Sequence, residues 1–291
     1  MIFIVYFFSM IAFSIWSINI YWYGIFYFVW FLAWYFFLKW VGKMWFLKRF
    51  DKLQKLLNKD TDDILIAIIL WVLIWWRLWE VFIYQWDYFS QNLFQIFAVW
   101  NWWMSFIGWI IWVLISLLIL KKIKKINIDE FWILIDCIVV FVPLAIFLWR
   151  FWNYLNQELY WLVVPENFWW ISTWLVDFLK NINLFHVYES IDLRLRVNTN
   201  FLSMFFEWLV LLVITITVFA RSIKKRKIKP GYISGFFLIF YSFFRFFLEY
   251  LRIDSQSQFV WIFTRSQRVF IIFFLIWFWF VFNKRFKKIN I

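Results

Sequence analysis

Apolar runs as long as membrane-spanning helices are the feature that most constrains the fold of this chain. They lie near 21–41, 63–83, 104–120, 131–149, 203–220, 232–250 and 266–283. A helix needs about 20 consecutive apolar residues to cross the hydrocarbon core of a bilayer. The chain is 66% hydrophobic and has a mean hydropathy of +0.76, outside the range of soluble domains. We therefore predict an all-α polytopic membrane protein with about seven transmembrane helices and a small extracytoplasmic subdomain.

Clusters of basic residues stand beside the apolar runs and set the orientation of the chain. They lie at 43–59, 121–125, 221–229 and 284–288. Short loops rich in Lys and Arg stay in the cytoplasm. This rule predicts a multi-pass protein with its N-terminus outside and its C-terminus in the cytoplasm. The net charge of +13 then indicates contact with anionic membrane lipid, and we expect no nucleic-acid partner.

The runs also divide the chain into segments. We predict an N-terminal interfacial segment at 1–20, because no basic region precedes it as in a standard signal peptide. Transmembrane helices 1–4 occupy 21–149, the extracytoplasmic subdomain 150–202, and helices 5–7 with a basic cytoplasmic tail 203–291. The single cysteine, Cys137, excludes an internal disulfide. We expect no metal site and no cofactor, because the sequence has no cluster of metal ligands and no glycine-rich phosphate loop.

Charged side chains stand at the ends of several apolar runs. Arg77 ends the second run, Arg150 and Glu158 follow the fourth, and Arg245, Glu249 and Arg252 end the sixth. A charge in the membrane costs roughly 2.5–3.5 kcal/mol on insertion scales, so such groups pair with one another or face a polar cavity. The planar fork of arginine matches phosphate. The predicted guest is therefore an anionic lipid head group.

Five stretches carry a resemblance to a known family. Y-W-Y-G-I-F-Y-F-V-W at 21–30 is similar to its first-helix signature, and W-W-R-L-W-E at 75–80 to its G-G-R-x-G segment. V-W-N-W-W-M-S-F-I-G-W-I-I-W at 99–112 resembles V-W-D-G-G-M-S-F-H-G-G-x-x-G, and W-R-F-W-N-Y-L-N-Q-E-L-Y-W at 149–161 resembles G-R-x-G-N-F-I-N-x-E-x-x-G. G-Y-I-S-G-F-F-L-I-F-Y-S-F-F-R-F-F-L-E-Y-L-R at 231–252 resembles its sixth-helix signature. These motifs stand in order along nearly the whole chain, and the family that they resemble is the prolipoprotein diacylglyceryl transferases.

The resemblance implies a reaction and its partners. The family transfers the diacylglyceryl group of phosphatidylglycerol to the lipobox cysteine thiol of a prolipoprotein and releases glycerol phosphate. This is the first step of bacterial lipoprotein maturation. The implied partners are phosphatidylglycerol, prolipoprotein signal peptides that bear a lipobox, and membrane lipid. The implied location is the bacterial plasma (inner) membrane, and no cofactor is implied.

The resemblance also implies roles for individual residues. Arg150 and Arg245 match family residues that would bind the phosphate and stabilise the charge of the leaving group. Glu249 would orient Arg245. The residues implied in substrate binding are Tyr23, Arg77, Asn153, Asn156, Glu158, Tyr241 and Arg252.

Tryptophan stands at many positions where this family has glycine. The chain has 27 Trp and only 5 Gly, the reverse of ordinary composition. The positions are Trp30, Trp75, Trp76, Trp79, Trp102, Trp103, Trp109, Trp112, Trp149, Trp152 and Trp161. By contrast, Trp22 and Trp100 stand where the family can have tryptophan. Our hypothesis is that many Trp letters are UGA codons read as Trp in a genome that uses UGA for glycine.

Other departures concern the chemistry of the thiol. The family has a histidine after M-S-F, a candidate base, where this chain has Ile107. The family's H-P-S-Q-L-Y-E reads F-L-S-M-F-F-E at 201–207, which keeps Ser203 and Glu207, and Gln157 replaces a glycine. The only histidine, His186, lies in the 150–202 segment and could supply the base, although a surface position is the simpler explanation.

Two alternatives to an active transferase stay open at this point. The first is a catalytically degenerate homologue that binds anionic lipid or lipoprotein precursors, for which Ile107 is the best argument. The second is an unrelated membrane transporter or lipid-handling scaffold, which would make the ordered motifs a coincidence. An assay for lipid transfer separates the transferase from the first, and transport across a vesicle membrane would favour the second.

Overall fold

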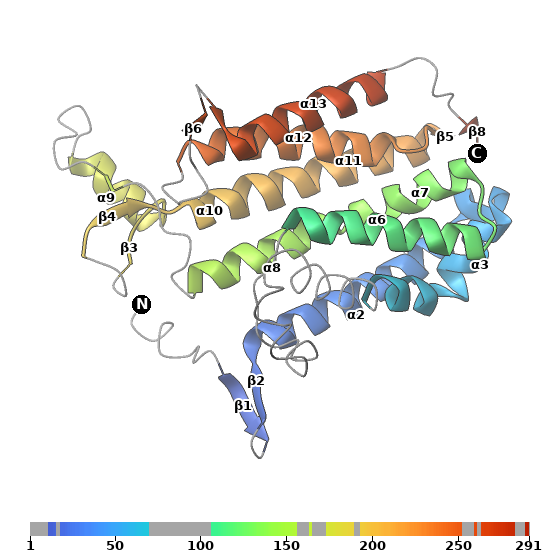
Figure 1. Cartoon of the computed structure of the whole chain (residues 1–291), viewed down its shortest axis with the longest axis horizontal. Helices are drawn as coiled ribbons and strands as arrows, with labels where there is room; N and C mark the ends of the chain where they lie inside the picture. The colour runs from blue at the N-terminus through green and yellow to red at the C-terminus, as the bar shows by residue number, and fades with distance from the viewer. Residues whose placement is uncertain are drawn as a thin grey trace, which may run out of the picture. The chain divides into compact units, whose positions relative to one another are not determined.

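The computed structural model is mostly helical (Figure 1). It describes residues 11–15, 18–69, 106–155, 163–164, 173–188, 193–251, 259–260, 263–282 and 289–290. These residues fall into two compact units. One unit comprises Met1–Leu32 and Ile135–Ile291, and the other comprises Ala33–Leu134. The residues discussed below as a site all belong to the first unit.

Long apolar helices make up most of the described chain. They are α2 (Trp22–Gly42), α6 (Phe106–Ile123), α7 (Ile128–Val139), α8 (Val142–Leu155), α11 (Leu211–Lys224), α12 (Tyr232–Glu249) and α13 (Arg265–Phe282). A helix α10 (Thr199–Ser203) and a π-helical stretch η4 (Met204–Val210) lead directly into α11. Shorter elements are η1 (Trp45–Arg49), α3 (Asp51–Asn58) and α9 (Thr173–Asn181), and residues 61–69 are also helical.

Short antiparallel ribbons complete the described secondary structure. β1 (Ile11–Ile15) pairs with β2 (Ile18–Tyr21), and β3 (Phe185–Val187) pairs with β4 (Leu195–Val197). β5 (Lys227–Ile228) pairs with β8 (Ile289–Asn290), and β6 (Phe259–Val260) pairs with β7 (Phe263–Thr264).

The helices agree with the predicted membrane spans. Among the described residues, Ile128–Leu155, Thr199–Lys224 and Tyr232–Glu249 are long and apolar enough to cross a membrane, and Phe28–Gly42 and Ser266–Phe282 are shorter apolar helices. The prediction of an all-α polytopic membrane protein is therefore confirmed. The predicted span at 63–83 leaves the described residues after residue 69, and most of the predicted segment 1–20 lies outside them as well.

Two features of the predicted fourth span differ from the simple hydropathy pattern. The run contains a break between α7 and α8, because the ring of Pro143 would clash with the carbonyl of Val139 four residues earlier. Hydropathy also predicts a helix end near residue 149, with Arg150 in the segment that follows. The helix itself continues past this point, since α8 ends at Leu155 and carries both Arg150 and Asn153. An ion pair, described below, compensates the charge of this buried arginine.

Helix starts in this fold follow from side-chain caps that the sequence supplies. At α7, Asn127 Oδ1 accepts from the N–H of Glu130 at 2.8 Å, and Glu130 Oε2 accepts from the N–H of Asn127 at 3.0 Å. This is the reciprocal pattern of a capping box. Asn198 caps α10 by accepting from the N–H of Phe201 at 3.1 Å. Each cap satisfies backbone donors that have no partner inside the helix.

The start of α12 is capped from another helix. Asp136 of α7 is buried, and its carboxylate accepts from the N–H groups of Gly231 (2.9 Å) and Ser234 (2.8 Å) and from the Ser234 hydroxyl (2.6 Å). Gly231 has a φ of 77°, a conformation that glycine adopts without strain. An anion at a helix N-terminus is favourable because backbone donors and the helix dipole both face it. The Asp136 carboxylate therefore fixes α12 at the end opposite Glu249.

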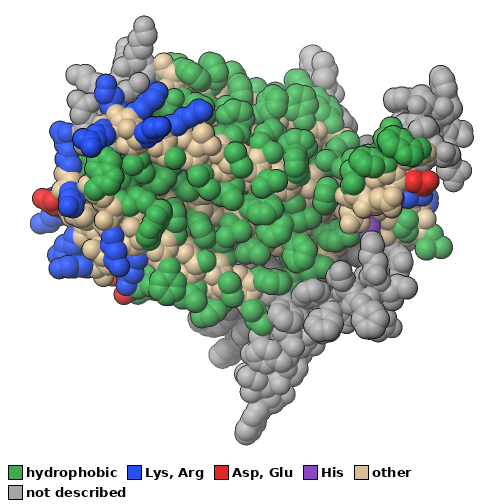
Figure 2. All heavy atoms as spheres, turned by 180° about the vertical axis from the view of Figure 1, so that it is seen from behind, with side chains coloured by type: hydrophobic (Ala, Val, Ile, Leu, Met, Phe, Trp, Pro, Cys, Tyr) green, Lys and Arg blue, Asp and Glu red, His purple; other side chains and the backbone are tan. Residues whose placement is uncertain are grey.

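Close packing of α12 on α13 depends on a glycine. The two helices lie side by side (Figure 1), and a Cβ atom at Gly235 would overlap the Cγ2 methyl of Val281. Nearby, Leu211, Phe237 and Tyr241 form a buried cluster that joins α11 to α12. Hydrophobic side chains also cover the outer sides of the helices, while Lys and Arg side chains gather where helices end (Figure 2). This distribution suits a lipid environment.

Candidate active site

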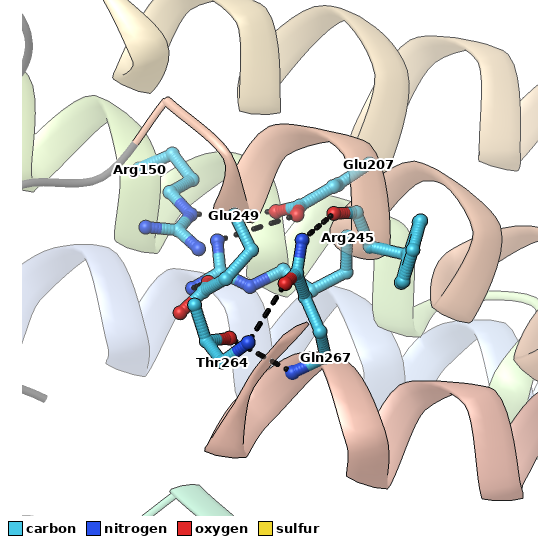
Figure 3. Close-up of polar contacts among 7 residues, drawn as sticks. Arg150, Glu207, Arg245, Glu249, Thr264 and Gln267 are labelled. Atoms are coloured by element: carbon cyan, nitrogen blue, oxygen red, sulfur yellow. Dashed lines mark hydrogen bonds and ion pairs between the residues drawn. The ribbon is translucent and has the colours of Figure 1, made fainter. Parts of the chain in front are cut away.

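Two arginines from different helices meet one carboxylate (Figure 3). Arg150 lies on α8, Arg245 on α12, and Glu207 on η4 between them. Arg150 Nε is 3.4 Å from Glu207 Oε2, and Arg245 Nη1 is 3.6 Å from Glu207 Oε1. Arg245 Nη2 is 3.3 Å from Oε2 of Glu249, one turn further along α12. The predicted catalytic residues Arg150, Arg245 and Glu249 are thus brought together through Glu207.

These four side chains form a buried network without net charge. Glu207 is 0% exposed, Glu249 2%, Arg245 7% and Arg150 8%. A charge so far from water is tolerated only when it is paired. Removal of one partner from a buried ion pair typically costs about 3–5 kcal/mol, because the other charge is left uncompensated. Each arginine therefore depends on Glu207 for its place in the helical bundle.

The contacts in this network are long for hydrogen bonds between charged groups. Charge-assisted hydrogen bonds between nitrogen and oxygen are commonly about 2.7–2.9 Å, shorter than the distances of 3.3–3.6 Å seen here. Within the described part of the chain, Arg245 Nη1 and both Glu207 oxygens have no hydrogen-bond partner. Arginine carries five N–H donors in a fixed fork. This planar fork matches the oxygens of a phosphate.

Glu207 owes its position to the π-helical stretch η4. Residues Met204–Val210 are wound more widely than an α-helix, between α10 and α11. Such insertions are rare and occur frequently at functional sites. η4 packs against both α8 and α12, the helices that carry the two arginines. Glu207 thus reaches both guanidinium groups from one helix.

Buried polar atoms extend the site along both arginine helices. Asn153 lies one turn after Arg150, and its Nδ2 group has no hydrogen-bond partner among the described residues. Ser242 lies one turn before Arg245, and its hydroxyl is buried in the same way. A buried polar atom without a partner costs about 1–3 kcal/mol. These atoms are therefore candidates for contact with a polar ligand.

The end of α12 is fixed beside the site by Gln267 of α13. At Tyr250 the helix tightens, and its N–H donates to the carbonyl of Phe247 at 3.2 Å. The Nε2 group of Gln267 donates to the carbonyl of Phe246 at 3.1 Å (Figure 3). Gln267 is fully buried and also forms a capping box with Thr264, with distances of 2.9 and 3.1 Å. The side chain of Gln267 thus caps the start of α13 and binds the last turn of α12, next to Arg245.

The structure places only some of the predicted substrate-binding residues. Tyr241 lies one turn before Arg245, and its ring packs against Phe237 and Phe270 at centroid distances of 5.8 and 6.1 Å. Tyr23 lies in the first turn of α2, and its side chain is outside the described set. Predicted residues that lie outside the described ranges are Arg77, Asn156, Glu158 and Arg252.

Glu207 is the residue that sequence reasoning about the site missed. It stands alone as a carboxylate within the apolar run at 203–220, and it is one of two residues kept in an otherwise altered motif. A lone ionisable residue inside a membrane span marks a functional position by default. Asp136 in the run at 131–149 carries the same signal, and it proves to be the cap of α12.

Comparison with known proteins gives the family of the chain. A model of the family described as prolipoprotein diacylglyceryl transferase matches residues 10–283. The phosphatidylglycerol–prolipoprotein diacylglyceryl transferase of Buchnera aphidicola subsp. Acyrthosiphon pisum (strain Tuc7) is 31% identical over 250 residues, 83% of each chain. The protein of the same name from Streptococcus pneumoniae (strain Hungary19A-6) is 28% identical over 210 residues, 71% of each chain. The chain belongs to the prolipoprotein diacylglyceryl transferase family.

Proposed function

We propose that this protein transfers the diacylglyceryl group of phosphatidylglycerol to the lipobox cysteine thiol of prolipoproteins. As a member of its family the protein is a transferase in a membrane. The observation that carries the proposal is the pair of buried arginines, Arg150 and Arg245, that share the carboxylate of Glu207. Phosphatidylglycerol, the prolipoprotein signal peptide and the surrounding lipid are the partners, and the chemistry uses no cofactor.

The proposed reaction is a nucleophilic displacement. The cysteine sulfur forms a bond to the glyceryl carbon that carries the phosphate, and the bond between that carbon and the phosphate oxygen breaks. The bonding electrons stay on the oxygen, so glycerol phosphate leaves with one more negative charge than the phosphodiester had. The thiol proton passes to a base. Charge therefore develops on the phosphate in the transition state, and that is where the catalyst needs cations.

The two arginines supply those cations. Their guanidinium groups are held 3.3–3.6 Å from the carboxylates of Glu207 and Glu249, and their positive charge would stabilise the phosphate as its negative charge grows. Glu249 orients Arg245, and Glu207 holds the spacing between the two guanidinium groups. Asn153 and Tyr241 would contact the polar head group from α8 and α12. We also propose that substrate is bound by Tyr23, Arg77, Asn156, Glu158 and Arg252.

The pairing of basic segments supports the proposed orientation. Lys52 Nζ donates to the carbonyl of Lys125 at 2.8 Å, and Lys124 pairs with Asp60 at 2.9 Å and with Asp63. The clusters at 43–59 and 121–125 are therefore in contact, as expected of two loops on one side of a membrane. β5 and β8 bring the third cluster beside the C-terminal tail in the same way. By the positive-inside rule, these segments face the cytoplasm of the bacterial inner membrane, and residues 1–20 and 150–202 face outward.

A defined transfer assay tests the proposed function. Purified protein is mixed with phosphatidylglycerol vesicles and a synthetic signal peptide that bears a lipobox cysteine, and the peptide mass is measured. We expect the mass to rise by one diacylglyceryl group while glycerol phosphate appears in equal amount. A peptide with serine in place of the cysteine is the matched control. Saturable binding of phosphatidylglycerol without any mass change would instead identify a non-catalytic lipid-binding homologue, in keeping with Ile107.

A further inference from the structure

The thiol in the proposed reaction needs a proton acceptor, and the arginine network does not provide one. A cysteine thiol has an ordinary pKa of about 8.5, so most of it is protonated at neutral pH. Glu207 and Glu249 already face guanidinium groups. A proton on either carboxylate would leave a buried arginine without its counter-ion, which is costly. A base outside this network avoids that cost.

The only imidazole in the chain lies against the helix that carries Arg150. His186 stands on β3, and its ring centroid is 5.2 Å from that of Tyr154 on α8. Tyr154 follows Arg150 by four residues, so both side chains lie on the same face of α8. Their Cβ atoms are then about 5–6 Å apart. His186 therefore contacts the turn of α8 that follows Arg150.

The β3–β4 ribbon is anchored to the helices of the site. Tyr188 is fully buried, its ring is 5.0 Å from that of His186, and its hydroxyl donates to Asn198 Oδ1 at 3.2 Å. The N–H of Asn198 also donates to the carbonyl of Leu184 at 2.8 Å. Asn198 caps α10, which packs against α8 and leads into the stretch that holds Glu207. The imidazole is thus fixed relative to Arg150 from two directions.

We propose that His186 is the general base that accepts the proton of the substrate thiol. This inference rests on the proposed transferase function. As the sulfur–carbon bond forms, a ring nitrogen of His186 takes the thiol proton, and the carbon–oxygen bond of the lipid breaks toward the phosphate. The imidazolium then releases the proton to the departing phosphate or to water. His186 is partly exposed, so a substrate cysteine can reach it.

His186 is surrounded by residues of types that do not ordinarily titrate near neutral pH. Tyr154 and Tyr188 contact its ring, and Arg196 stands directly across the ribbon from it. α9 also packs against β3 and carries Asp177 and Lys180, both exposed. Of these residue types, histidine alone ordinarily changes charge between about pH 5 and 8. A pH profile therefore distinguishes the base from its neighbours.

The first test compares wild type, H186Q and D177N in the transfer assay from about pH 5 to pH 9. We expect the rate of the wild type to rise with pH through the histidine range. H186Q should lose about 10²–10⁴-fold near neutral pH and recover partly as the thiol itself ionises near pH 8.5. D177N, an exposed neighbour, should follow the wild type. An equal loss for H186Q at every pH indicates a structural role and overturns the proposal, as does unchanged activity.

Chemical modification tests the same claim without a mutation. Because the chain has one histidine, diethyl pyrocarbonate gives one carbethoxylated imidazole, and hydroxylamine removes it. We expect activity to fall with modification of His186 and to return with hydroxylamine. Full modification of His186 with full activity overturns the proposal. If wild type and H186Q are equally active, only the proposal that His186 is the base is rejected. If wild type is inactive, both the transferase function and the role of His186 are rejected.

Discussion

The carboxylate of Glu207 lies 3.4 Å from the guanidinium of Arg150. Its other oxygen lies 3.6 Å from Arg245, so one buried acid determines the separation of the two arginines. The relationship joins α8, η4 and α12, which come from distant parts of the sequence. Negative charge grows on the phosphate during the proposed reaction. A fixed pair of arginines stabilises that transition state better than mobile arginines would, because the fixed pair does not have to reorganise.

Glu207 should be essential for both stability and rate. In E207Q the two arginines lose a shared counter-ion, and we expect a loss of about 3–5 kcal/mol in the free energy of unfolding, as for other broken buried ion pairs. E249Q should be milder, because Arg245 keeps Glu207. Thermal unfolding in detergent and the transfer rate measure the two effects. Wild-type stability of E207Q would show that the arginines do not depend on this carboxylate.

The α12–α13 contact should be sensitive to one methyl group. G235A places a Cβ atom against Val281 and should destabilise the protein by about 1–3 kcal/mol, the usual cost of overpacking. The double variant G235A/V281A removes the opposing methyl groups and should recover part of that loss. Unfolding curves of the two variants and of the wild type measure both the loss and the recovery of stability. A G235A protein as stable as wild type would mean that the helices separate without cost.

The segments joined by Lys124 and Asp60 should lose stability in acid. Lys124 accounts for most of the lowering of the Asp60 pKa, through a hydrogen bond and its charge, while Lys55 and Lys59 act at longer range. A lowered pKa means that the ionised Asp60 stabilises the fold above its ordinary pKa of about 3.9, and that this stability is lost as pH falls further. K124M should show a smaller fall in melting temperature between pH 6 and pH 3, values chosen to bracket that pKa. An identical fall in both proteins would exclude the pair as a cause.

The tryptophans at family glycine positions should be glycine in the native protein. Peptide mass spectrometry of natively expressed protein across 75–112 and 149–161 tests this directly. We expect glycine masses at Trp149 and Trp152 and a tryptophan mass at Trp100. Trp149 and Trp152 flank Arg150 on α8, where glycine would let the backbone approach a phosphate. Tryptophan masses throughout would instead favour the non-catalytic homologue.

Much of this architecture could be predicted because hydropathy reports burial in lipid. The apolar runs predicted the helices, and the charges at their ends singled out Arg150, Arg245 and Glu249, whose roles were implied by the family resemblance. The end of α8 could not be predicted, because a charge lowers hydropathy whether or not a distant carboxylate compensates it. That compensation comes from Glu207, more than fifty residues later in the chain.

The remaining features depend on contacts between distant residues. The wider winding of η4 leaves no periodic signal in a run that is apolar on every side. The caps supplied by Asp136 to α12 and by Gln267 to Phe246 also join different helices. In the sequence, each of these side chains is recognisable only as a polar residue in or beside an apolar run. That position indicates that the residue matters, but it does not predict which group the side chain contacts.

The most direct test of the central claim is the rate of glycerol phosphate release by wild type, R150K and R245K. Lysine keeps the positive charge but loses the planar fork that engages a phosphate. We expect each variant to lose roughly 10²–10³-fold in kcat with a smaller change in KM, because the arginines act on charge that develops in the transition state. Wild-type kcat in both variants would contradict the account, since the buried arginine pair would then have no part in the chemistry.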